Sequence, residues 1–339
     1  MFYIRGDANS EIGSGHIMRC LAIAKSLKKR GEDTTFITAD REAEKLITGN
    51  GFSMINLDTT WNNLEYEMEK LAGVIQKIGI EKLMVDSYSV TDRYMQFLSD
   101  LTKVIYMDDL NESIYPLDML INYSISADKQ DYEKKYESTK ILIGTRYIPL
   151  REEFAGIKRI HKVKVKDILI TTGGSDSYNM SGELIKYIRK FSFLTDWKLH
   201  IVVGTFNVHK DELYKLEKEF HNIFLYENIS HISELMCKCD IAISAGGTTL
   251  YELCACGIPS ICFTFADNQI RGIEEFNRQG LIYYAGDIRN DMNKSLDLII
   301  KELKALDNDY NRRGNLSIRM MDLVDGQGAD RIAGEILML

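Results

Sequence analysis

The stretch Arg5-Gly-Asp-Ala-Asn-Ser-Glu-Ile-Gly-Ser-Gly-His-Ile-Met-Arg19 decides the fold that we expect for this chain. The apolar run at residues 2–7 is typical of a short buried strand. After the glycines, apolar residues recur at helical spacing until Gly31 supplies a stop; they are Ile17, Leu21, Ala24 and Leu27. A strand, a glycine loop and a helix in this order open an α/β unit.

The rest of the first half continues this alternation. Apolar segments expected to be strands lie at residues 34–38, 53–57, 82–87 and 104–107, and amphipathic stretches such as 63–78 separate them. Apolar strands that alternate with helices predict a parallel sheet covered on both faces. The alternation loosens after Leu110, and the basic segment 155–165 has the character of a linker.

A second α/β series begins at Lys166. Its further expected strands lie at residues 199–204, 223–226, 241–244 and 260–265, and residues 291–339 are expected to form two or three helices, broken at Gly326 and Gly328. We therefore predict two Rossmann-like, doubly wound domains, residues 1–155 and residues 156–339 with the terminal helices. Because open α/β sheets bind ligands at the carboxyl ends of their strands, we expect the domains to face a ligand cleft.

Composition limits the classes of partner. With 339 residues, 45% of them hydrophobic, the chain can bury two substantial cores. Its formal net charge of −8 argues against nucleic acid or an anionic membrane as the main partner, and leaves room for a local pocket for a small anion. Without an apolar stretch of about 18 residues or a secretory signal, we expect a cytoplasmic protein with no stable membrane insertion.

Neither the cysteines nor the paired acids predict a metal site. The six cysteines are expected to be reduced thiols. The pairs Cys237-x-Cys239 and Cys254-x-Cys256 lack the spacer of a zinc knuckle and fall in expected helices. The adjacent Asp108 and Asp109 at a strand end are interpreted as solvated, or as caps of a following turn.

The first loop places His16 in the first turn of its helix. Gly13 and Gly15 tolerate positive φ and let the backbone approach a ligand closely. The free amides and dipole at this helix end favour a neutral imidazole that can accept a proton, as water activation requires. Capping of the helix by His16 explains its position equally well.

Two later loops also join a strand to a helix. The amides of residues 171–179 can cradle a diphosphate, although a plain strand-to-helix turn is the simpler explanation of Gly173-Gly174. Residues 244–249 open another helix, in which Glu252 either accepts the hydroxyls of a ribose or only offsets the helix dipole.

A fourth loop and a tyrosine complete the set of candidate residues. Residues 265–270 end a strand and start a helix, so Asn268 and Gln269 are expected to face the same ligand. Tyr88 follows a strand of the first half, where a lone tyrosine is more often a packing residue than a functional one.

Together these residues resemble the nucleotide-sugar hydrolases of the pseudaminic acid pathway, which remove UDP from UDP-2,4-diacetamido-2,4,6-trideoxy-β-L-altropyranose. Relatives of that family also occur in spore-coat and other surface-polysaccharide pathways. The resemblance runs from Arg5 to about Gly280. It rests on Arg5-x-Asp7 with Ile-Gly-x-Gly-His16-x-x-Arg19, Val-Asp-x-Tyr88, Leu150-Arg-Glu-Glu-Phe154, Gly173-Gly174-x-Asp176 with Asn179, Ser-Ala-Gly-Gly-Thr with Glu252, and Asn268-Gln269.

The resemblance implies a GT-B-like fold in which the second domain holds UDP and the sugar lies toward the first. It implies that His16 activates water, that Tyr88 and Asn268 are further catalytic residues, and that Glu252 binds the ribose. The residues expected to bind substrate are Arg5, Asp7, Gly13, Gly15, Arg19, Gly173, Gly174, Ser175, Asp176, Asn179, Ser244, Ala245, Gly246, Gly247, Thr248, Glu252 and Gln269.

The expected reaction is metal-independent hydrolysis at the anomeric carbon with inversion. No cofactor is expected, a UDP-sugar is the predicted partner, and the sequence does not specify an oligomeric state. One rival is a GT-B glycosyltransferase with a UDP-N-acetylhexosamine-type donor, in which an acceptor hydroxyl replaces water. The other is a sugar-nucleotide sensor without activity, which the fold alone permits.

Overall fold

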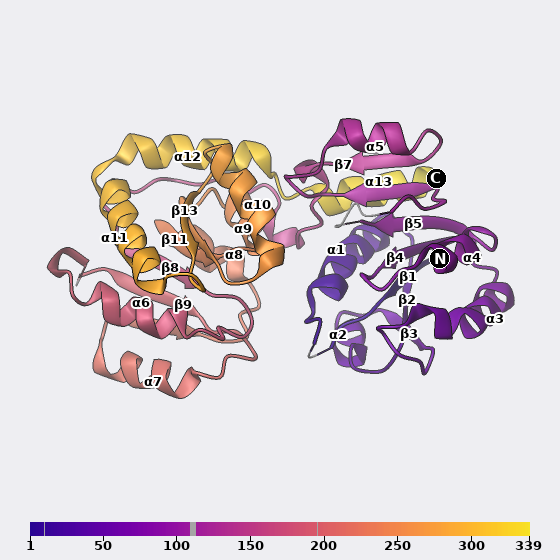
Figure 1. Ribbon diagram of the computed structural model, residues 1–339, viewed down its shortest axis with the longest axis horizontal. Coiled ribbons are helices and arrows are strands. Elements are labelled where there is room, and N and C mark those ends of the chain that lie inside the picture. The colour runs from indigo at the N-terminus through magenta and orange to yellow at the C-terminus, as the bar shows by residue number, and fades with distance from the viewer. Residues whose placement is uncertain (10, 109–112, 195) are drawn as a thin grey trace. The chain divides into compact units, whose positions relative to one another are not determined.

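A computed structural model describes residues 1–9, 11–108, 113–194 and 196–339. The chain divides into two compact units (Figure 1). Unit 1 comprises Met1–Glu152 and Gly326–Leu339, and unit 2 comprises Glu153–Asp325. None of the helices within these ranges is long and apolar enough to cross a membrane.

Unit 1 is built on a parallel sheet in the order β3-β2-β1-β4-β5-β6-β7. Its strands are β1 (Phe2–Gly6), β2 (Thr34–Thr38), β3 (Ser53–Asn56), β4 (Lys82–Asp86), β5 (Lys103–Met107), β6 (Met119–Asn122) and β7 (Lys140–Ile143). Its helical elements are α1 (Gly15–Lys29), α2 (Glu44–Gly49), η1 (Leu64–Glu67), α3 (Met68–Ile78), α4 (Asp92–Ser99), α5 (Lys129–Lys135), η2 (Thr145–Tyr147) and α13 (Gly328–Met338), and η3 (Glu152–Phe154) spans the junction of the units.

The central strands of unit 1 are buried along their whole length, as their apolar sequences require. Every residue of β1 and β2 is buried. Side chains of β4 and β5 pack with those of α3 and α4 in one core, in which Leu71, Leu83 and Val104 are fully buried. A parallel sheet with both faces covered is the arrangement that the alternating pattern predicted.

Helix α13 departs from the expected domain assignment, because it packs in unit 1 and not in the second domain. It lies against α1, and Arg30 beyond α1 donates to Asp330 at 2.7 Å. At Gly328 a Cβ atom would come within 2.1 Å of the Ile148 carbonyl oxygen, so only glycine permits this approach. The second domain expected at residues 156–339 therefore ends at Asp325, and the chain returns to unit 1.

Unit 2 contains a second parallel sheet, in the order β10-β9-β8-β11-β12-β13. Its strands are β8 (Asp167–Thr171), β9 (Lys198–Val202), β10 (Ile223–Tyr226), β11 (Ile241–Ala245), β12 (Ser260–Thr264) and β13 (Tyr283–Asp287). Its helices are α6 (Met180–Ile188), η4 (Ser192–Leu194), α7 (Lys210–Glu219), α8 (Ile232–Lys238), α9 (Thr249–Ala255), α10 (Asp267–Arg278), α11 (Met292–Asn308) and α12 (Tyr310–Leu323).

Two doubly wound parallel sheets confirm the predicted α/β fold class. In unit 1 the strand order reverses between β1 and β4, and in unit 2 it reverses between β8 and β11. Loops that leave neighbouring strands in opposite directions at such a point leave a crevice at the carboxyl edge of the sheet. Each unit therefore has one such edge, and the candidate loops follow these strands.

Two local expectations need correction. Strand β13, which includes Gly286, was not anticipated from the sequence; it is an edge strand, and several of its side chains are only half-buried. Asp108 was expected to be solvated or to cap a following turn, but it is buried and accepts a hydrogen bond from the Tyr132 hydroxyl at 2.6 Å. Its neighbour in the expected acidic pair, Asp109, lies outside the described residues.

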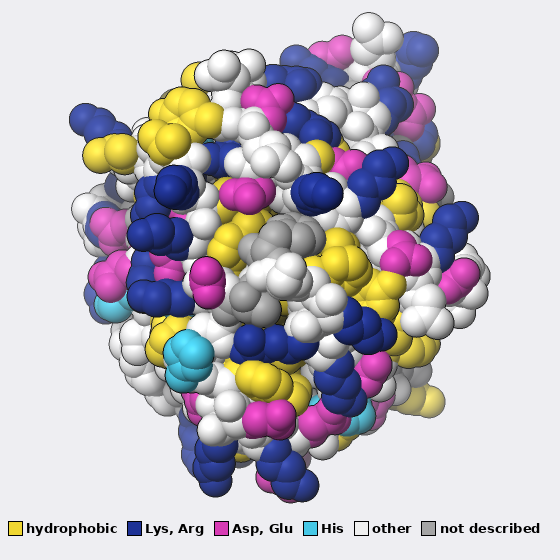
Figure 2. All heavy atoms as spheres, turned by 90° about the vertical axis from the view of Figure 1, so that its left-hand side faces the viewer, with side chains coloured by type: hydrophobic (Ala, Val, Ile, Leu, Met, Phe, Trp, Pro, Cys, Tyr) yellow, Lys and Arg dark blue, Asp and Glu magenta, His cyan; other side chains and the backbone are white. Residues whose placement is uncertain are grey.

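The surface in Figure 2 carries charges of both signs. Among the described side chains on this face, Lys and Arg are interspersed with Asp and Glu. Mixed charge of this kind is the ordinary pattern of a solvated protein surface.

Candidate functional site

The carboxyl edge of β1 and β4 brings His16 and Tyr88 together. His16 is the second residue of α1, and Tyr88 follows β4 by two residues. The two rings meet edge to face, with centroids 4.6 Å apart and planes at 74°. His16 is buried, whereas Tyr88 is 52% exposed. An imidazole is thus held by an aromatic ring at the point where the strand order of unit 1 reverses.

The loop before α1 is shaped by its own backbone and one asparagine. Asn9 accepts hydrogen bonds through its side-chain oxygen from the amides of Glu11 and Ile12 at 2.9 and 3.0 Å. The amide of Gly13 donates to the Asn9 carbonyl at 2.9 Å, and Gly13 has a φ of 70°, which glycine adopts without strain.

No acidic side chain in the first turn of α1 offsets the positive end of the helix dipole. The first turn contains no Asp or Glu, and the N-cap residue Ser14 makes no side-chain capping hydrogen bond within the described part of the chain. The positive end of the helix dipole therefore lies beside His16 and is not offset by a carboxylate of that turn. An anionic ligand is favoured at this place.

Arg19 and Asp86 clamp the first turns of α1 to the end of β4. Arg19 Nε donates to Asp86 Oδ2 at 2.7 Å, Nη2 donates to Asp86 Oδ1, and Nη1 donates to the Tyr123 hydroxyl. Burial alone would raise the pKa of Asp86, but the charge and hydrogen bonds of Arg19 outweigh it and hold that pKa below its ordinary value. Asp86 is therefore a buried carboxylate in a bidentate ion pair.

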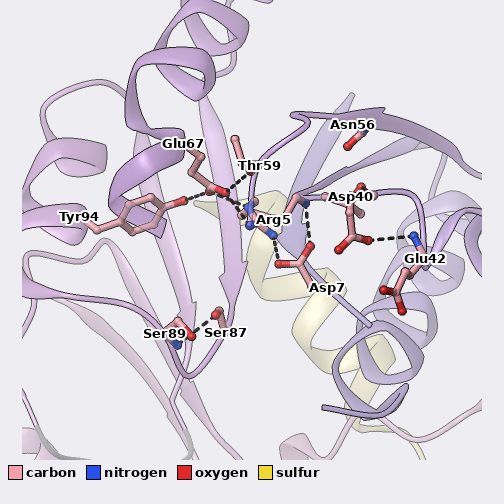
Figure 3. Close-up of polar contacts among 12 residues, drawn as sticks. Arg5, Asp7, Asp40, Glu42, Asn56, Thr59, Glu67, Ser87, Ser89 and Tyr94 are labelled. Carbon is pink, nitrogen blue, oxygen red and sulfur yellow. Dashed lines mark hydrogen bonds and ion pairs between the residues drawn. The ribbon is translucent and has the colours of Figure 1, made fainter. Parts of the chain in front are cut away.

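Arg5 lies at the centre of a second buried network (Figure 3). Its Nε and Nη2 donate to the two carboxylate oxygens of Glu67 at 2.7 and 2.6 Å, and its Nη1 donates to Asp7 at 2.5 Å. Tyr94 donates to Glu67 at 2.7 Å, and the other oxygen of Asp7 accepts from the Ala39 amide at 2.8 Å. Arg5 is 0% exposed, and its side chain holds Glu67 and Asp7 beside the loop after β1.

The hydrogen-bonding groups of the loop after β8 and of the start of α6 are largely paired with one another. Asp176 accepts hydrogen bonds from the amides of Met180 and Ser181 at 2.8 and 3.1 Å, and so caps α6. Asn179 has a φ of 53° and donates to Glu212 at 2.8 Å. A carboxylate already occupies the start of α6, and this favours the simpler interpretation of Asp176 and Asn179 as structural residues.

Gly173 and Gly174 are exposed, and they lie against the loop after β9. The Phe206 amide donates to the Gly174 carbonyl at 3.1 Å. A Cβ atom on Gly204 would come within 2.2 Å of that same oxygen, so the two loops touch backbone to backbone. Ser175 is half-buried and bonds to Ser177 at 3.0 Å. Gly173 and Gly174 are thus exposed to solvent on one side and packed against the loop after β9 on the other.

The loop after β11 is less satisfied by side chains. Ser244 is buried and donates to the Ala245 carbonyl at 2.9 Å. Gly247 has a φ of 140°, a value that favours glycine. Thr248 is exposed, and as the N-cap of α9 it makes no side-chain capping hydrogen bond within the described residues. Glu252, one turn into α9, is partly exposed.

The loops after β11 and β12 lie side by side. A Cβ atom on Gly246 would be 3.0 Å from the Cβ atom of Gln269, so a larger residue there would push on α10. Gln269 accepts a hydrogen bond from the Phe265 amide at 3.0 Å, which orders the turn into α10. Asn268, in the first turn of α10, is exposed.

The structure thus gathers the candidates in two sets, one in each unit. His16, Tyr88, Arg19 and the glycine loop share the β1 and β4 edge, and Gly246, Gly247 and Gln269 share the β11 and β12 edge. Sequence reasoning missed Glu67, Tyr94, Asp86 and Tyr123. The motif Val-Asp-x-Tyr88 contains Asp86 and could have pointed to it. Glu67 lies 62 residues from its partner Arg5, and no motif of the sequence marks it.

No cluster of three or more His, Cys, Asp or Glu side chains in the described part of the chain is arranged to hold a metal ion.

Residues 168–312 match the model of the glycosyltransferase family 28 C-terminal domain, which corresponds to most of unit 2. Relatives of the whole chain include "Spore coat polysaccharide biosynthesis protein SpsG" of Bacillus subtilis, 23% identical over 97% of this chain and 95% of the relative. The "UDP-2,4-diacetamido-2,4,6-trideoxy-beta-L-altropyranose hydrolase" of Campylobacter jejuni is 27% identical over 76% of this chain and 90% of its own.

A third relative, "Uncharacterized protein MJ1062" of Methanocaldococcus jannaschii, is 28% identical over 75% of this chain. The match spans only 54% of that relative's length. This chain is thus related to proteins named for UDP-sugar hydrolysis and for spore coat polysaccharide biosynthesis, in agreement with the resemblance drawn from the motifs.

Solved structures show the same fold at low identity. Spinosyn rhamnosyltransferase SpnG superposes with a TM-score of 0.71 at 13% identity, with 100% of both chains covered. The crystal structure of Acinetobacter baumannii MurG superposes with a TM-score of 0.68 at 12% identity, again over 100% of both chains.

Proposed function

We propose that this chain is an enzyme that acts on a UDP-sugar, and that it hydrolyses the bond between UDP and the anomeric carbon of a diacetamido-trideoxy sugar. One observation carries the proposal: His16 lies against Tyr88 at the edge of unit 1 where the strand order reverses. The named relatives support this substrate class, and we assign the reaction to pseudaminic acid or related surface-polysaccharide biosynthesis.

In this reaction a water molecule attacks C1 of the sugar from the face opposite UDP. A neutral imidazole of His16 takes the proton of the water as the new C–O bond forms, and the bond between C1 and the phosphate oxygen breaks. UDP leaves with the bonding electrons, and the configuration at C1 is inverted. A general base typically contributes on the order of 10² to 10⁴ in rate, which is roughly 3 to 5.5 kcal/mol of barrier.

Unit 2 supplies the binding of UDP in this proposal. We place the diphosphate at the loop before α9, because nothing lies within 4 Å of the position that a Cβ atom of Gly247 would take and no side chain caps the helix within the described residues. The start of α6 is less suited, since Asp176 already occupies its amides. Glu252 accepts the ribose hydroxyls, and Asn268 contacts the reacting end of the substrate.

We assign a supporting role to Arg5 and Asp7, because both side chains are buried. The proposed contacts with the sugar come from the loop of Gly13 and Gly15 and from His16 and Tyr88. Single variants of these residues should lower turnover.

A glycosyltransferase is the alternative, favoured by the match of residues 168–312 to a glycosyltransferase domain. Incubation of the purified chain with a panel of UDP-sugars and no acceptor separates the two. The hydrolase proposal expects multiple turnovers of UDP and free sugar with one of the diacetamido-trideoxy donors. UDP release that needs an added acceptor would establish the transferase instead, and UDP-sugar binding without turnover under either condition would indicate a sensor.

A further inference from the structure

The loop after β6 leaves the sheet of unit 1 at the same edge as Tyr88. Val85 pairs with Tyr106, and Tyr106 pairs with Leu120, so Tyr88 and Tyr123 lie equally far beyond one level of the sheet. Only β5 separates β4 from β6, and two strand spacings amount to about 10 Å. The loop after β6 is therefore near enough to the ring of Tyr88 to contact the same small ligand.

Arg19 ties this loop to helix α1. Its Nη1 donates to the Tyr123 hydroxyl, and its guanidinium carbon lies 5.5 Å from the centroid of the Tyr123 ring. The other nitrogens of Arg19 bind Asp86. Because His16 lies one turn before Arg19 in α1, the loop is held beside the helix that carries the proposed base.

A buried chain of hydrogen bonds fixes the start of the loop. Asn122 Nδ2 donates to the Tyr132 hydroxyl at 2.7 Å, and that hydroxyl donates to Asp108 at 2.6 Å. Asn122 Oδ1 accepts from the amide of Ser124 at 2.8 Å. Asn122, Tyr132 and Asp108 are all buried, so they anchor the backbone of Ser124 from inside the unit.

Two serine hydroxyls of this loop are in contact. The Oγ atoms of Ser124 and Ser126 are 2.8 Å apart, and the amide of Ser126 donates to Ser124 Oγ at 3.2 Å. Both serines are partly exposed, as is Ile125 between them. In such a pair one hydroxyl donates and the other accepts, so the pair carries both kinds of hydrogen-bonding group.

The loop suits an uncharged polar group of a ligand. Residues 122–127 contain no Lys, Arg, Asp or Glu, so no charge of this segment favours a phosphate or a cation. An amide requires an acceptor for its N–H and a donor for its carbonyl oxygen. The serine pair supplies both groups, with an apolar side chain between them.

We propose that Ser124 and Ser126 bind an acetamido group of the sugar and thereby select donors that carry one. The inference rests on the proposed substrate, a UDP-linked diacetamido-trideoxy sugar. One serine hydroxyl donates to the acetamido carbonyl, the other accepts from the acetamido N–H, and Ile125 packs against the methyl group. A sugar with a hydroxyl in place of the acetamido group loses the contacts of the carbonyl and the methyl group.

The test measures binding by isothermal titration calorimetry in a His16→Ala parent, in which the proposed base is absent and the UDP-sugar is not consumed. UDP and the diacetamido-trideoxy UDP-sugar are titrated into this parent and into the same chain with Ser124→Ala and Ser126→Ala. We expect both proteins to bind UDP equally, and the affinity for the UDP-sugar to fall about 10- to 100-fold through the loss of two hydrogen bonds.

UDP-glucose, which has no acetamido group, tests the selectivity. The serine substitutions should leave the affinity for UDP-glucose nearly unchanged, so the preference for the acetamido sugar narrows. The control is Ser99→Ala in α4, which removes a hydroxyl that donates to the Gln96 carbonyl at 2.8 Å and should bind all three ligands as the parent does. Circular dichroism checks that each variant is folded, and each single serine variant should show part of the loss.

Three results would overturn the proposal: equal losses for UDP-glucose and the acetamido sugar, an unchanged affinity for the acetamido sugar, or a parent that binds this sugar nucleotide no more tightly than UDP. The single serine variants decide if the double variant does not fold. A wild-type chain that binds the acetamido UDP-sugar but releases no UDP contradicts the proposed hydrolysis alone, because the binding comparison does not depend on turnover.

Discussion

The imidazole of His16 and the phenol ring of Tyr88 lie edge to face, 4.6 Å between centroids, although 72 positions of sequence (88 − 16) separate them. The parallel pairing of β1 with β4 produces this contact, since it aligns Gly6 with Asp86 at the carboxyl edge. Ring packing of this kind fixes the direction of the imidazole. The proposed chemistry therefore depends on a contact made wholly within unit 1.

Replacing His16 tests the base directly. His16→Ala should lower kcat by on the order of 10² to 10⁴ and leave the affinity for UDP nearly unchanged, because UDP is assigned to unit 2. Steady-state kinetics with a UDP-sugar and calorimetric titration with UDP measure the two effects. Near-normal turnover in this variant would remove His16 from the mechanism.

Tyr88 separates ring packing from the hydroxyl group. Tyr88→Phe keeps the edge-to-face contact with His16, whereas Tyr88→Ala removes it, so the alanine variant should lose more of kcat than the phenylalanine variant. The same steady-state assay compares them. Equal losses in the two variants would show that the ring does not position the imidazole.

The ion pair of Arg19 with Asp86 should position His16 one turn away on α1. Arg19→Lys retains the charge but loses the bidentate contact. We expect kcat to fall by on the order of 10² through misplacement of the base, with a smaller change in KM. The control is Arg30→Lys at the other end of α1, whose pair with Asp330 is 40% and 55% exposed and should contribute little.

A pH profile distinguishes positioning from simple destabilisation. The negative charge of Asp86 interacts with His16, and an anion beside an imidazole stabilises its protonated form. In Asp86→Asn the acidic limb of the profile of kcat/KM should therefore move to lower pH. An unchanged profile in a folded variant would contradict the electrostatic role of Asp86.

The return of the chain to unit 1 predicts different effects for two glycines of α13. Gly328→Ala places a methyl group against the backbone of Ile148 and should destabilise unit 1 by about 1 to 3 kcal/mol. Gly334→Ala, whose nearest neighbour is an Arg30 nitrogen at 3.8 Å, should be neutral or stabilise the helix by up to about 1 kcal/mol.

The two tryptophans report these effects separately. Trp61 belongs to unit 1 and Trp197 to unit 2, so urea unfolding in a Trp197→Phe background follows unit 1 alone. Loss of stability in unit 2 and not in unit 1 on introducing Gly328→Ala would contradict the placement of α13.

Unit 2 should lose stability in mild acid through His200. Burial lowers the pKa of His200 below its ordinary 6.5, although Asp167 partly opposes this effect. The unfolded chain therefore binds more protons than the folded one as the pH falls below 6.5. The stabilisation of unit 2 by neutral His200, which is fully present above that pH, is lost as the pH falls toward the lowered pKa.

Asp167 acts in the same direction at lower pH. Burial would raise the pKa of Asp167, but hydrogen bonds from His200 and Lys162 bring this pKa below 3.8. The stabilisation by the Asp167 carboxylate is therefore present above pH 3.8 and is lost as the pH falls through the lowered pKa. Urea unfolding of the Trp61→Phe variant between pH 7 and 5 follows unit 2, in which burial lowers the pKa of both His200 and His161, and adding His200→Asn should reduce the pH dependence. An equally steep dependence in that double variant would refute the assignment.

The regular elements could be predicted because their signals are local. The expected strand at residues 34–38 coincides with β2, and that at residues 223–226 coincides with β10. In each sheet, the candidate loops follow strands whose carboxyl ends lie at the same edge, because parallel pairing aligns those ends. Even the break between Gly326 and Gly328 separates two helices as expected.

What could not be predicted depends on distant pairings. Glu67 lies within the expected amphipathic stretch at residues 63–78, and no local pattern marks it as buried. It is fully buried because Arg5 and Tyr94 satisfy its carboxylate. The membership of α13 in unit 1 depends on the absence of a Cβ atom at Gly328, which has meaning only beside Ile148. Arg5 was predicted to bind substrate because it belongs to the motif Arg5-x-Asp7. Its burial depends on its contacts with Glu67 and Asp7, which the structure shows.

The most direct test of the proposed chemistry follows the oxygen atom of the attacking water. The reaction of a diacetamido-trideoxy UDP-sugar in ¹⁸O-labelled water is stopped early, and the masses of both products are measured by mass spectrometry before the free sugar exchanges its anomeric oxygen. Attack at C1 predicts ¹⁸O in the free sugar and none in UDP. Label in UDP, and none in the sugar, would show attack at phosphorus and would contradict the mechanism assigned to His16.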